Sequence, residues 1–232
     1  MTGEMFLSGE YFEKFPTWHA EDSPWKASQI IKMMRRNDIK AQTICEIGCG
    51  AGEILANLQR NLPEECIFSG YEISPQAFEL SSRLANARLK FNLMNILEEK
   101  DVNFNLILLI DVIEHIEDYF SLLRGIKGKS TYKILHIPLE LTVYNLLRKK
   151  SFLGTRQLYG HIHYFTKDIS LKILEETGYE TLDYFYTGSS LEVPHISAKD
   201  NLLNLIRKPF YSVHQDLAVR FLGGYSLMVL AR

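Results

Sequence analysis

Between about residues 24 and 137, short β-rich apolar runs alternate with amphipathic helical patterns. Runs that are apolar throughout and are separated by helices are typical of a parallel sheet covered on both faces. We therefore predict an α/β fold, doubly wound and Rossmann-like, with right-handed crossovers. The predicted strands are 43–47, 66–72, 88–93, 104–111 and 132–137, and the predicted helices begin near residues 23, 53, 74 and 117.

After Ile137 the rhythm changes. A capped helix from Thr166 to Gly178, a strand from Thr181 and a strand over 224–232 predict an antiparallel hairpin with a long insertion that closes the sheet. The segments 138–160 and 190–222 do not fit this rhythm, and we expect them to be lids or pocket walls. A role in covering apolar surface or in a homodimer interface is left open.

The totals place this chain among ordinary globular proteins. Its 232 residues predict one domain, 1–232, with a core at about 24–137, 165–189 and 224–232. A formal net charge of −2 gives no general attraction for nucleic acid. The longest apolar run, Leu106–Ile110, is too short for stable membrane insertion, and the N-terminus lacks the apolar region of a signal peptide. Three cysteines without zinc spacing suit a reducing compartment, so we expect a cytoplasmic protein.

Three glycines on alternate positions, Gly48, Gly50 and Gly52, follow the first predicted strand. Glycine lets backbone N–H groups approach a ligand because no Cβ intervenes, although tight packing between strand and helix is a second explanation. The dinucleotide fingerprint G-x-G-x-x-G would need glycine where this chain has Glu53. A carboxylate there is favoured by the helix dipole but would repel a pyrophosphate, so we expect a ligand other than a diphosphate.

The second predicted strand ends in Glu72, about twenty residues after the glycine turn. An acid at this point of an α/β sheet can accept hydrogen bonds from both hydroxyls of a ribose, and Ile73 can lie against an adenine. Together with Glu53, this arrangement predicts a cationic or zwitterionic adenosine derivative.

Five stretches of the sequence resemble the class I S-adenosylmethionine-dependent methyltransferases: EIGCGAG, GYEIS, LMNILEE, LILLIDVIEHIED and GHIHYFTKDISLKILEETGYE. The chain is most similar to small-molecule methyltransferases of the group that includes the ubiquinone-biosynthesis O-methyltransferases, over roughly residues 20–185 plus the last strand. The resemblance implies a mostly parallel seven-stranded sheet with a C-terminal antiparallel strand and lid insertions. It also implies an enzyme that uses S-adenosylmethionine to methylate a small molecule, with oxygen the favoured acceptor.

The resemblance also implies a set of residues that bind the cofactor. Glu46 would orient the glycine turn or reach the methionyl amino group, Glu72 would hold the ribose, and Asn95 would accept a hydrogen bond from adenine in place of the usual acid. Asp111 would lie near the methionyl amino group. The full set is Glu46, Gly48, Cys49, Gly50, Gly52, Glu72, Ile73, Asn95, Ile96, Ile110 and Asp111.

Methyl transfer needs alignment and exclusion of water more than covalent catalysis, because the sulfonium already activates the methyl group. A hydroxyl acceptor gains from a general base, for which the candidates are His115, His161 and His163. Helix capping or packing is the alternative role for each. In some ubiquinone O-methyltransferases the acid, Glu and His that match Asp111, Glu114 and His115 bind a divalent ion, but we predict no metal here.

Two other functions stay open. A fold relative could bind S-adenosylmethionine or S-adenosylhomocysteine without transferring a methyl group and serve as a regulatory or partner-binding protein. A dinucleotide-dependent oxidoreductase is disfavoured by Glu53. The sequence GIKGKS at 125–130 is not a phosphate loop, because Leu123 stands where the first glycine is needed.

Overall fold

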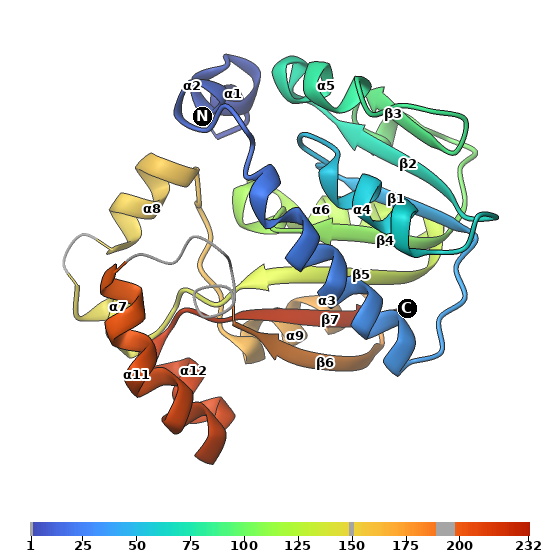
Figure 1. Ribbon diagram of the computed structural model, residues 1–232. Helices are drawn as coiled ribbons and strands as arrows, with labels where there is room; N and C mark the ends of the chain where they lie inside the picture. Colours follow the sequence, from blue (N-terminus) through green and yellow to red (C-terminus); the bar gives the residue numbers. More distant parts are fainter. Residues whose placement is uncertain (1, 149–150, 189–197) are drawn as a thin grey trace.

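The structure, a computed structural model, describes residues 2–148, 151–188 and 198–232, with no side-chain description at 2, 3 and 198–203. Seven strands form one sheet in the order β3-β2-β1-β4-β5-β7-β6 (Figure 1). The strand β7 is antiparallel to both β5 and β6, and all other neighbouring strands are parallel. The predicted fold class is therefore confirmed. The strands are β1 (Thr43–Ile47), β2 (Ile67–Glu72), β3 (Leu89–Leu93), β4 (Phe104–Ile110), β5 (Ser130–Pro138), β6 (Thr181–Thr187) and β7 (Ser226–Ala231).

Helices pack on both faces of the sheet, as parallel strands that are apolar throughout require. One face is covered by α3 (Ser23–Arg36) and α4 (Glu53–Asn61), and the other by α6 (Tyr119–Ile126) and α9 (Lys167–Glu176). The remaining described α-helices are α1 (Thr2–Leu7), α2 (Glu10–Lys14), α5 (Pro75–Ser82), α7 (Val143–Leu146), α8 (Ser151–Tyr159), α11 (Ala198–Val213) and α12 (Gln215–Leu222).

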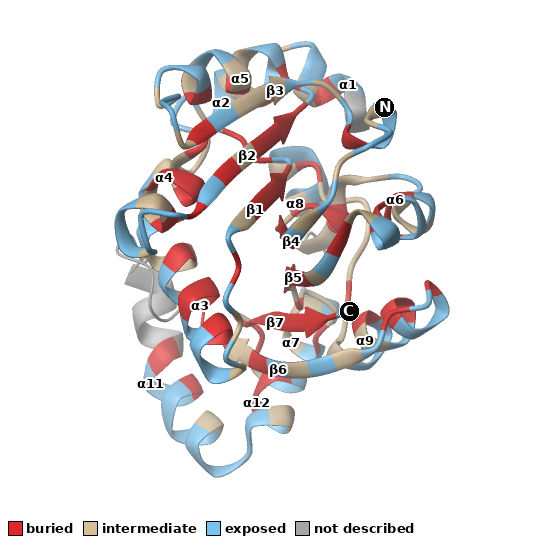
Figure 2. Cartoon of the chain, turned by 90° about the vertical axis from the view of Figure 1, so that its right-hand side faces the viewer, coloured by how far each residue is buried: buried red, intermediate tan, exposed pale blue. Residues whose placement is uncertain are grey.

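The centre of the sheet is the most deeply buried part of the fold (Figure 2). Successive residues of β4 face opposite sides, so that Leu106 and Leu108 join the cluster under α3 and α4. Ile107 and Leu109 join the cluster under α6 and α9. Burial on both faces explains why β4 has no polar alternation in the sequence.

The strand order changes direction between β1 and β4. From β1 the chain continues outward to β2 and β3, whereas from β4 it continues the other way to β5. Loops at the carboxyl ends of two such strands diverge and leave a crevice between them, where open α/β sheets bind their ligands. The glycine turn after β1 and Asp111 after β4 therefore meet at this crevice.

The predicted lid segments contain helices. The first segment contains α7 and α8, and the second contains α11 and α12, while residues 149–150 and 189–197 lie outside the described part of the chain. Figure 1 shows these four helices gathered beyond one end of the sheet. Among the described residues, no helix combines the length and the apolar composition needed to cross a bilayer.

Candidate functional site

A cavity of about 910 Å³ lies at the carboxyl ends of β1, β2 and β4. It is lined by all eleven residues that the sequence predicts to bind the cofactor, and by His115 and His161. N-terminal residues that the sequence assigns to no element of the core, among them Phe6, Tyr11 and Trp18, form a further part of its wall. The fold therefore brings the predicted binding and catalytic residues together, with one exception described below.

The glycine turn has a backbone that side chains rarely adopt. Gly48, Gly50 and Gly52 have φ angles of 66°, 53° and 79°, in the left-handed region that glycine enters without steric cost. A Cβ on Gly50 would lie 2.4 Å from Cδ1 of Trp18, and one on Gly52 would lie 2.6 Å from Cζ of Phe91. The turn thus needs glycine both for its conformation and for the close approach of neighbouring groups.

Glu72 ties this turn to the end of β2. Its Oε2 accepts a hydrogen bond from the N–H of Gly50 at 2.8 Å, and its Oε1 accepts from the N–H groups of Ile73 and Ser74, each at 2.8 Å. Burial raises the pKa of Glu72, and the three amides partly offset that rise because they favour the charged form. A carboxylate has about four lone-pair positions, so one acceptor position, on Oε2, is left for a ribose hydroxyl.

Glu46 is a buried acid with one carboxylate oxygen to which no described group donates a hydrogen bond. Its side chain in β1 is 1% exposed, and its Oε2 has no hydrogen-bond partner. Burial raises the pKa of Glu46 well above its ordinary value, and nearby Lys26 opposes the rise. A buried, unpartnered carboxylate oxygen is costly unless a cationic or donor group fills the site. The cavity therefore fits a ligand with an ammonium group at this position.

Asp111 is held by two side chains of the protein. Its Oδ2 lies 2.8 Å from Nζ of Lys26, and its Oδ1 lies 2.6 Å from Nδ1 of His136. His136 in turn lies 2.8 Å from Oγ1 of Thr187 through Nε2. Although burial alone would raise the pKa of Asp111, His136 and Lys26 hold it below its ordinary range. A cofactor amino group would therefore share this carboxylate with two residues already bound to it.

The adenine side of the cavity contains Ile73, Asn95 and Ile96. Asn95 Oδ1 accepts a hydrogen bond from the N–H of Leu97 at 3.0 Å and so caps the short helix Ile96–Glu98. That oxygen already has one donor, which limits its capacity to accept from adenine. Ile73 is 46% exposed, so its side chain is accessible to a planar ring.

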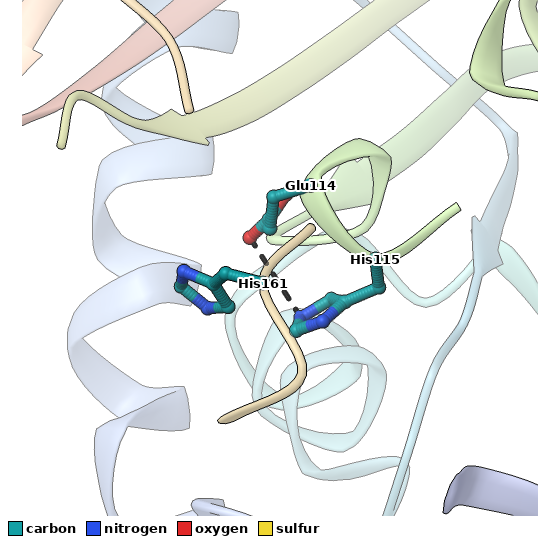
Figure 3. Close-up of side chains that lie close together, drawn as sticks. All are labelled: Glu114, His115 and His161. Atoms are coloured by element: carbon teal, nitrogen blue, oxygen red, sulfur yellow. Dashed lines mark ion pairs between the residues drawn. The ribbon is translucent and has the colours of Figure 1, made fainter. Parts of the chain in front are cut away.

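Three side chains that line the cavity form a cluster: Glu114 and His115 after β4, and His161 after α8 (Figure 3). One ligand atom from each lies within 4.8 Å of the others. Although the side chain of Glu114 is fully buried, neither of its carboxylate oxygens has a hydrogen-bond partner among the described residues. Its Oε1 lies 3.9 Å from Nε2 of His115, beyond hydrogen-bond distance. Burial, together with the charge of Asp111, raises the pKa of Glu114 well above its ordinary value.

The ring orientations of the two histidines are fixed from outside the cluster. His115 Nδ1 lies 3.3 Å from the carbonyl oxygen of Gly160, which can only accept, so Nδ1 carries the proton and Nε2 has the lone pair. Burial and the nearby His161 lower the pKa of His115 to about 4. His161 Nδ1 lies 2.8 Å from Oε2 of Glu140, an arrangement that orients the imidazole.

His163 does not line the cavity that the described residues form, and the prediction of a catalytic role for it is not supported by its position. Its Nε2 donates a hydrogen bond to the carbonyl oxygen of Ile116 at 3.0 Å, and its ring packs edge-on against Tyr119. In an extended strand two residues this close, His161 and His163, would point to the same side. Residues 160–166 have no regular secondary structure, and here His161 faces the cavity whereas His163 lies against α6.

No sequence pattern selects His136 or Glu140 as a site residue. His136 lies inside the apolar run of β5, where a histidine usually packs in the core, and Glu140 lies in a predicted lid. Their functional context depends on partners that are far apart in the chain, Asp111 and His161, so no local pattern could have identified them.

Comparison with known proteins identifies a family that matches most of this chain. A family model described as a methyltransferase domain matches residues 18–184. No curated protein sequence gives a significant match. Among solved structures, magnesium protoporphyrin IX methyltransferase from Synechocystis PCC 6803 with bound S-adenosylhomocysteine has a TM-score of 0.59 and 13% identity over 90% of this chain and 81% of that one.

Two further structures share the fold. The N-methyltransferase NodS from Bradyrhizobium japonicum WM9 has a TM-score of 0.54 and 14% identity, and the match covers 89% of this chain and 93% of that one. The [4+2]-cyclase SpnF has a TM-score of 0.62 and 12% identity, with 89% and 80% covered. A cyclase among these neighbours shows that the fold alone does not determine the reaction.

Proposed function

We propose that this chain, which belongs to the methyltransferase family and uses S-adenosylmethionine as its cofactor, methylates a hydroxyl oxygen of a small molecule. The observation that carries the proposal is the unpartnered, buried Oε2 of Glu46, which lines the same cavity as the glycine turn and Glu72. An acceptor for an ammonium group and an acceptor for a ribose diol thus face one cavity, as a nucleoside with a methionyl chain requires.

Each end of the cofactor has its own residues in this proposal. Glu72 accepts from one ribose hydroxyl through its remaining acceptor position, and Ile73 and Ile96 enclose the adenine. Glu46 accepts from the methionyl amino group, while the backbone of Gly48 and Gly50 lies along the chain that carries the sulfur. Three buried acids line this cavity, whereas its described lining contains one lysine, Lys26. This excess of acids favours a ligand that carries a sulfonium and an ammonium.

The acceptor hydroxyl lies beside His115 in this proposal. Its oxygen attacks the methyl carbon in line with the sulfonium, the carbon–sulfur bond breaks, and the hydroxyl proton moves to Nε2 of His115. Because the pKa of His115 is about 4, the ring is neutral at physiological pH and can accept that proton. Phe6, Tyr11 and Trp18 cover the cavity and exclude water from the reacting atoms.

A second candidate role for the same cluster is to hold a divalent cation, which the two unpartnered oxygens of Glu114 favour. Glu114, His115 and His161 offer one carboxylate and two imidazoles, a donor set suited to transition metals. An ion bound there would act as a Lewis acid toward the acceptor oxygen. Methyl transfer unaffected by a strong chelator would exclude this role, and loss of transfer that added Mn²⁺ or Zn²⁺ restores would support it.

Methyl transfer is tested by screening small hydroxylated compounds with radiolabelled S-adenosylmethionine. Incorporation of label that stops when the hydroxyl is replaced by hydrogen supports the proposal. Stoichiometric binding of S-adenosylmethionine without transfer to any acceptor of this class would instead favour a regulatory or partner-binding protein. Thermal stabilisation by NAD in place of S-adenosylmethionine would contradict both functions.

A further inference from the structure

The most exposed apolar side chains of the described residues lie on three helices at one end of the molecule. Every described large apolar side chain that is more than 60% exposed belongs to α7, to its C-cap residue Leu147, to α8 or to α11. We call this set the α7–α11 apolar surface: Leu146, Leu147, Leu153, Leu205, Ile206 and Val213. Single exposed apolar residues are ordinary, but a group of them confined to neighbouring helices marks an interaction surface.

The helices that carry this surface adjoin one another at the corner before β7. A Cβ on Gly223 would lie 3.1 Å from Oγ1 of Thr142, the N-cap residue of α7, and a Cβ on Gly224 would lie 2.8 Å from Cζ of Arg207 in α11. The helix α12 contacts both α7 and α11, and α8 contacts α7, so the three helices belong to one connected group (Figure 1). The surface is therefore built by segments that are about sixty residues apart in the sequence but adjacent in the fold.

On α11 the exposed and buried positions alternate with helical periodicity. Asn204 and Arg207 are buried toward the rest of the domain. Leu205, Ile206 and Val213 are exposed, at spacings that place them along one side of the helix. The helix thus has one face packed on its own domain and a second apolar face that contacts solvent.

Positive charge accompanies this surface. Arg148 and Arg156 are exposed, and the sequence from 141 to 164 contains no acidic residue, in a chain whose formal net charge is −2. Lys149 and Lys150 belong to the same stretch of sequence but lie outside the described residues. Lys208 adds an exposed cation to α11 between the apolar positions. Apolar helices with flanking Lys and Arg bind the interface of a bilayer that contains anionic lipid.

The same charge disfavours a second copy of the chain as the occupant. A twofold interface brings identical patches together, so two segments without acids would place their cations against each other. Anionic lipid headgroups are complementary to these cations, and the acyl region can receive the leucine side chains. The bilayer is therefore the occupant that both properties of the surface fit.

We propose that the α7–α11 apolar surface docks this protein on the surface of a bilayer that contains anionic lipids. Docking places the cavity next to the lipid interface, because α7 and α8 lie in the chain between Glu140 and His161, which both line the cavity. An acceptor with a lipid tail and a hydroxyl near its polar end then reaches the cluster without leaving the membrane surface. This last step rests on the proposed function, whereas docking itself does not.

The test is co-flotation of the full-length protein with vesicles, in the absence of cofactor. Vesicles of phosphatidylcholine with about 30% phosphatidylglycerol, on the scale at which anionic lipid gives a useful surface potential, are compared with vesicles of phosphatidylcholine alone. We expect binding to the anionic vesicles that falls at least about tenfold in the Leu147→Glu/Val213→Glu variant or at high salt. Ile67→Glu, at an exposed position on β2 outside this surface, should bind as the unaltered protein does.

Binding of S-adenosylhomocysteine serves as the check that each variant is folded, and it also separates the two proposals. A failure of docking with intact cofactor binding overturns only the docking. Absence of co-flotation, equal loss in Ile67→Glu, or no dependence on anionic lipid would each contradict it. A concentration-dependent dimer that Leu147→Glu abolishes would show that the surface binds a second copy.

Discussion

The N–H of Gly50 donates a hydrogen bond of 2.8 Å to Oε2 of Glu72, so the glycine turn after β1 is fastened to the end of β2. The bond joins the turn after β1 to the last residue of the adjacent parallel strand β2, and it places the acid beside the turn before any ligand arrives. Binding energy is then not spent on assembling these two parts. The predictions below test this arrangement and the cluster at the other end of the cavity.

Gly50→Ala should weaken binding of S-adenosylhomocysteine at least about tenfold, because the φ of 53° is strained for alanine and the new methyl group would meet Trp18. Isothermal titration calorimetry measures the change. Gly128→Ala is the matched control, because a Cβ there meets nothing within 4 Å, and it should bind as the unaltered protein does. Equal affinity in both variants would show that the turn does not contact the ligand.

Lys26→Met should lower the free energy of unfolding by roughly 2–3 kcal/mol, because it removes the ammonium partner of Asp111 and leaves a buried charge poorly compensated. Methionine retains the apolar stem, so the loss reports mainly on charge. Denaturant titration gives the value. Arg83→Met breaks an exposed pair with Glu79 and should cost less than about 1 kcal/mol; similar losses in the two variants would contradict the role of Lys26.

Glu114→Gln should stabilise the protein at pH 8 by about 1–2 kcal/mol in the presence of a chelator. The pKa of Glu114 is raised in the folded state, so the folded state binds more protons than the unfolded state at pH values between the two pKa values. The free energy of unfolding therefore falls as the pH rises through that window, and glutamine removes this decline. Denaturation at pH 5 and pH 8 measures it, and a less stable variant at pH 8 would show that another group compensates the charge.

His115→Gln should lower kcat by roughly 10²–10³-fold with little change in the KM for S-adenosylmethionine, because the base acts on the acceptor and not on the cofactor. With a pKa of about 4, His115 should stay neutral and active well below pH 6.5, where an ordinary histidine is already half protonated. Steady-state kinetics across this range provide both readouts. His163→Gln, outside the cavity lining, should keep kcat within about threefold; the reverse order of effects would assign the base to His163.

Local patterns were enough to predict most of the fold. The strands β1 to β5, the glycine turn and the cap of α5 by Ser74 follow from apolar runs, glycine spacing and a Ser-Pro pair, each of which acts over a few residues. Ser23 also precedes a proline, but α3 begins at Ser23 itself, so this serine does not cap the helix as Ser74 caps α5. Boundaries of this kind depend on the chain before the helix, which the pattern does not describe.

The candidate site likewise contains some residues that local patterns predict and others that they do not. Glu46, Glu72 and Asp111 lie at or near the carboxyl ends of β1, β2 and β4, which are neighbours in the sheet. The parallel arrangement of the strands was enough to predict that these residues lie close together. The partners of Asp111 and His161 could not, because Lys26 and Glu140 arrive from α3 and from the chain after β5 through tertiary packing. The N-terminal cover over Gly50 depends on aromatic contacts between Tyr11, Trp18 and Phe15 that have no sequence period.

The most direct measurement is calorimetric titration of the full-length protein, and of Glu72→Gln, with S-adenosylhomocysteine. We expect one site per chain in the unaltered protein and an affinity at least about tenfold lower in the variant. Glutamine replaces one carboxylate oxygen with an NH2 group that can only donate, so it cannot accept from both the backbone N–H groups of the turn and a ribose hydroxyl. Thermal unfolding confirms that the variant is folded. No heat with the unaltered protein, or the same affinity in both, would contradict the cofactor site described here.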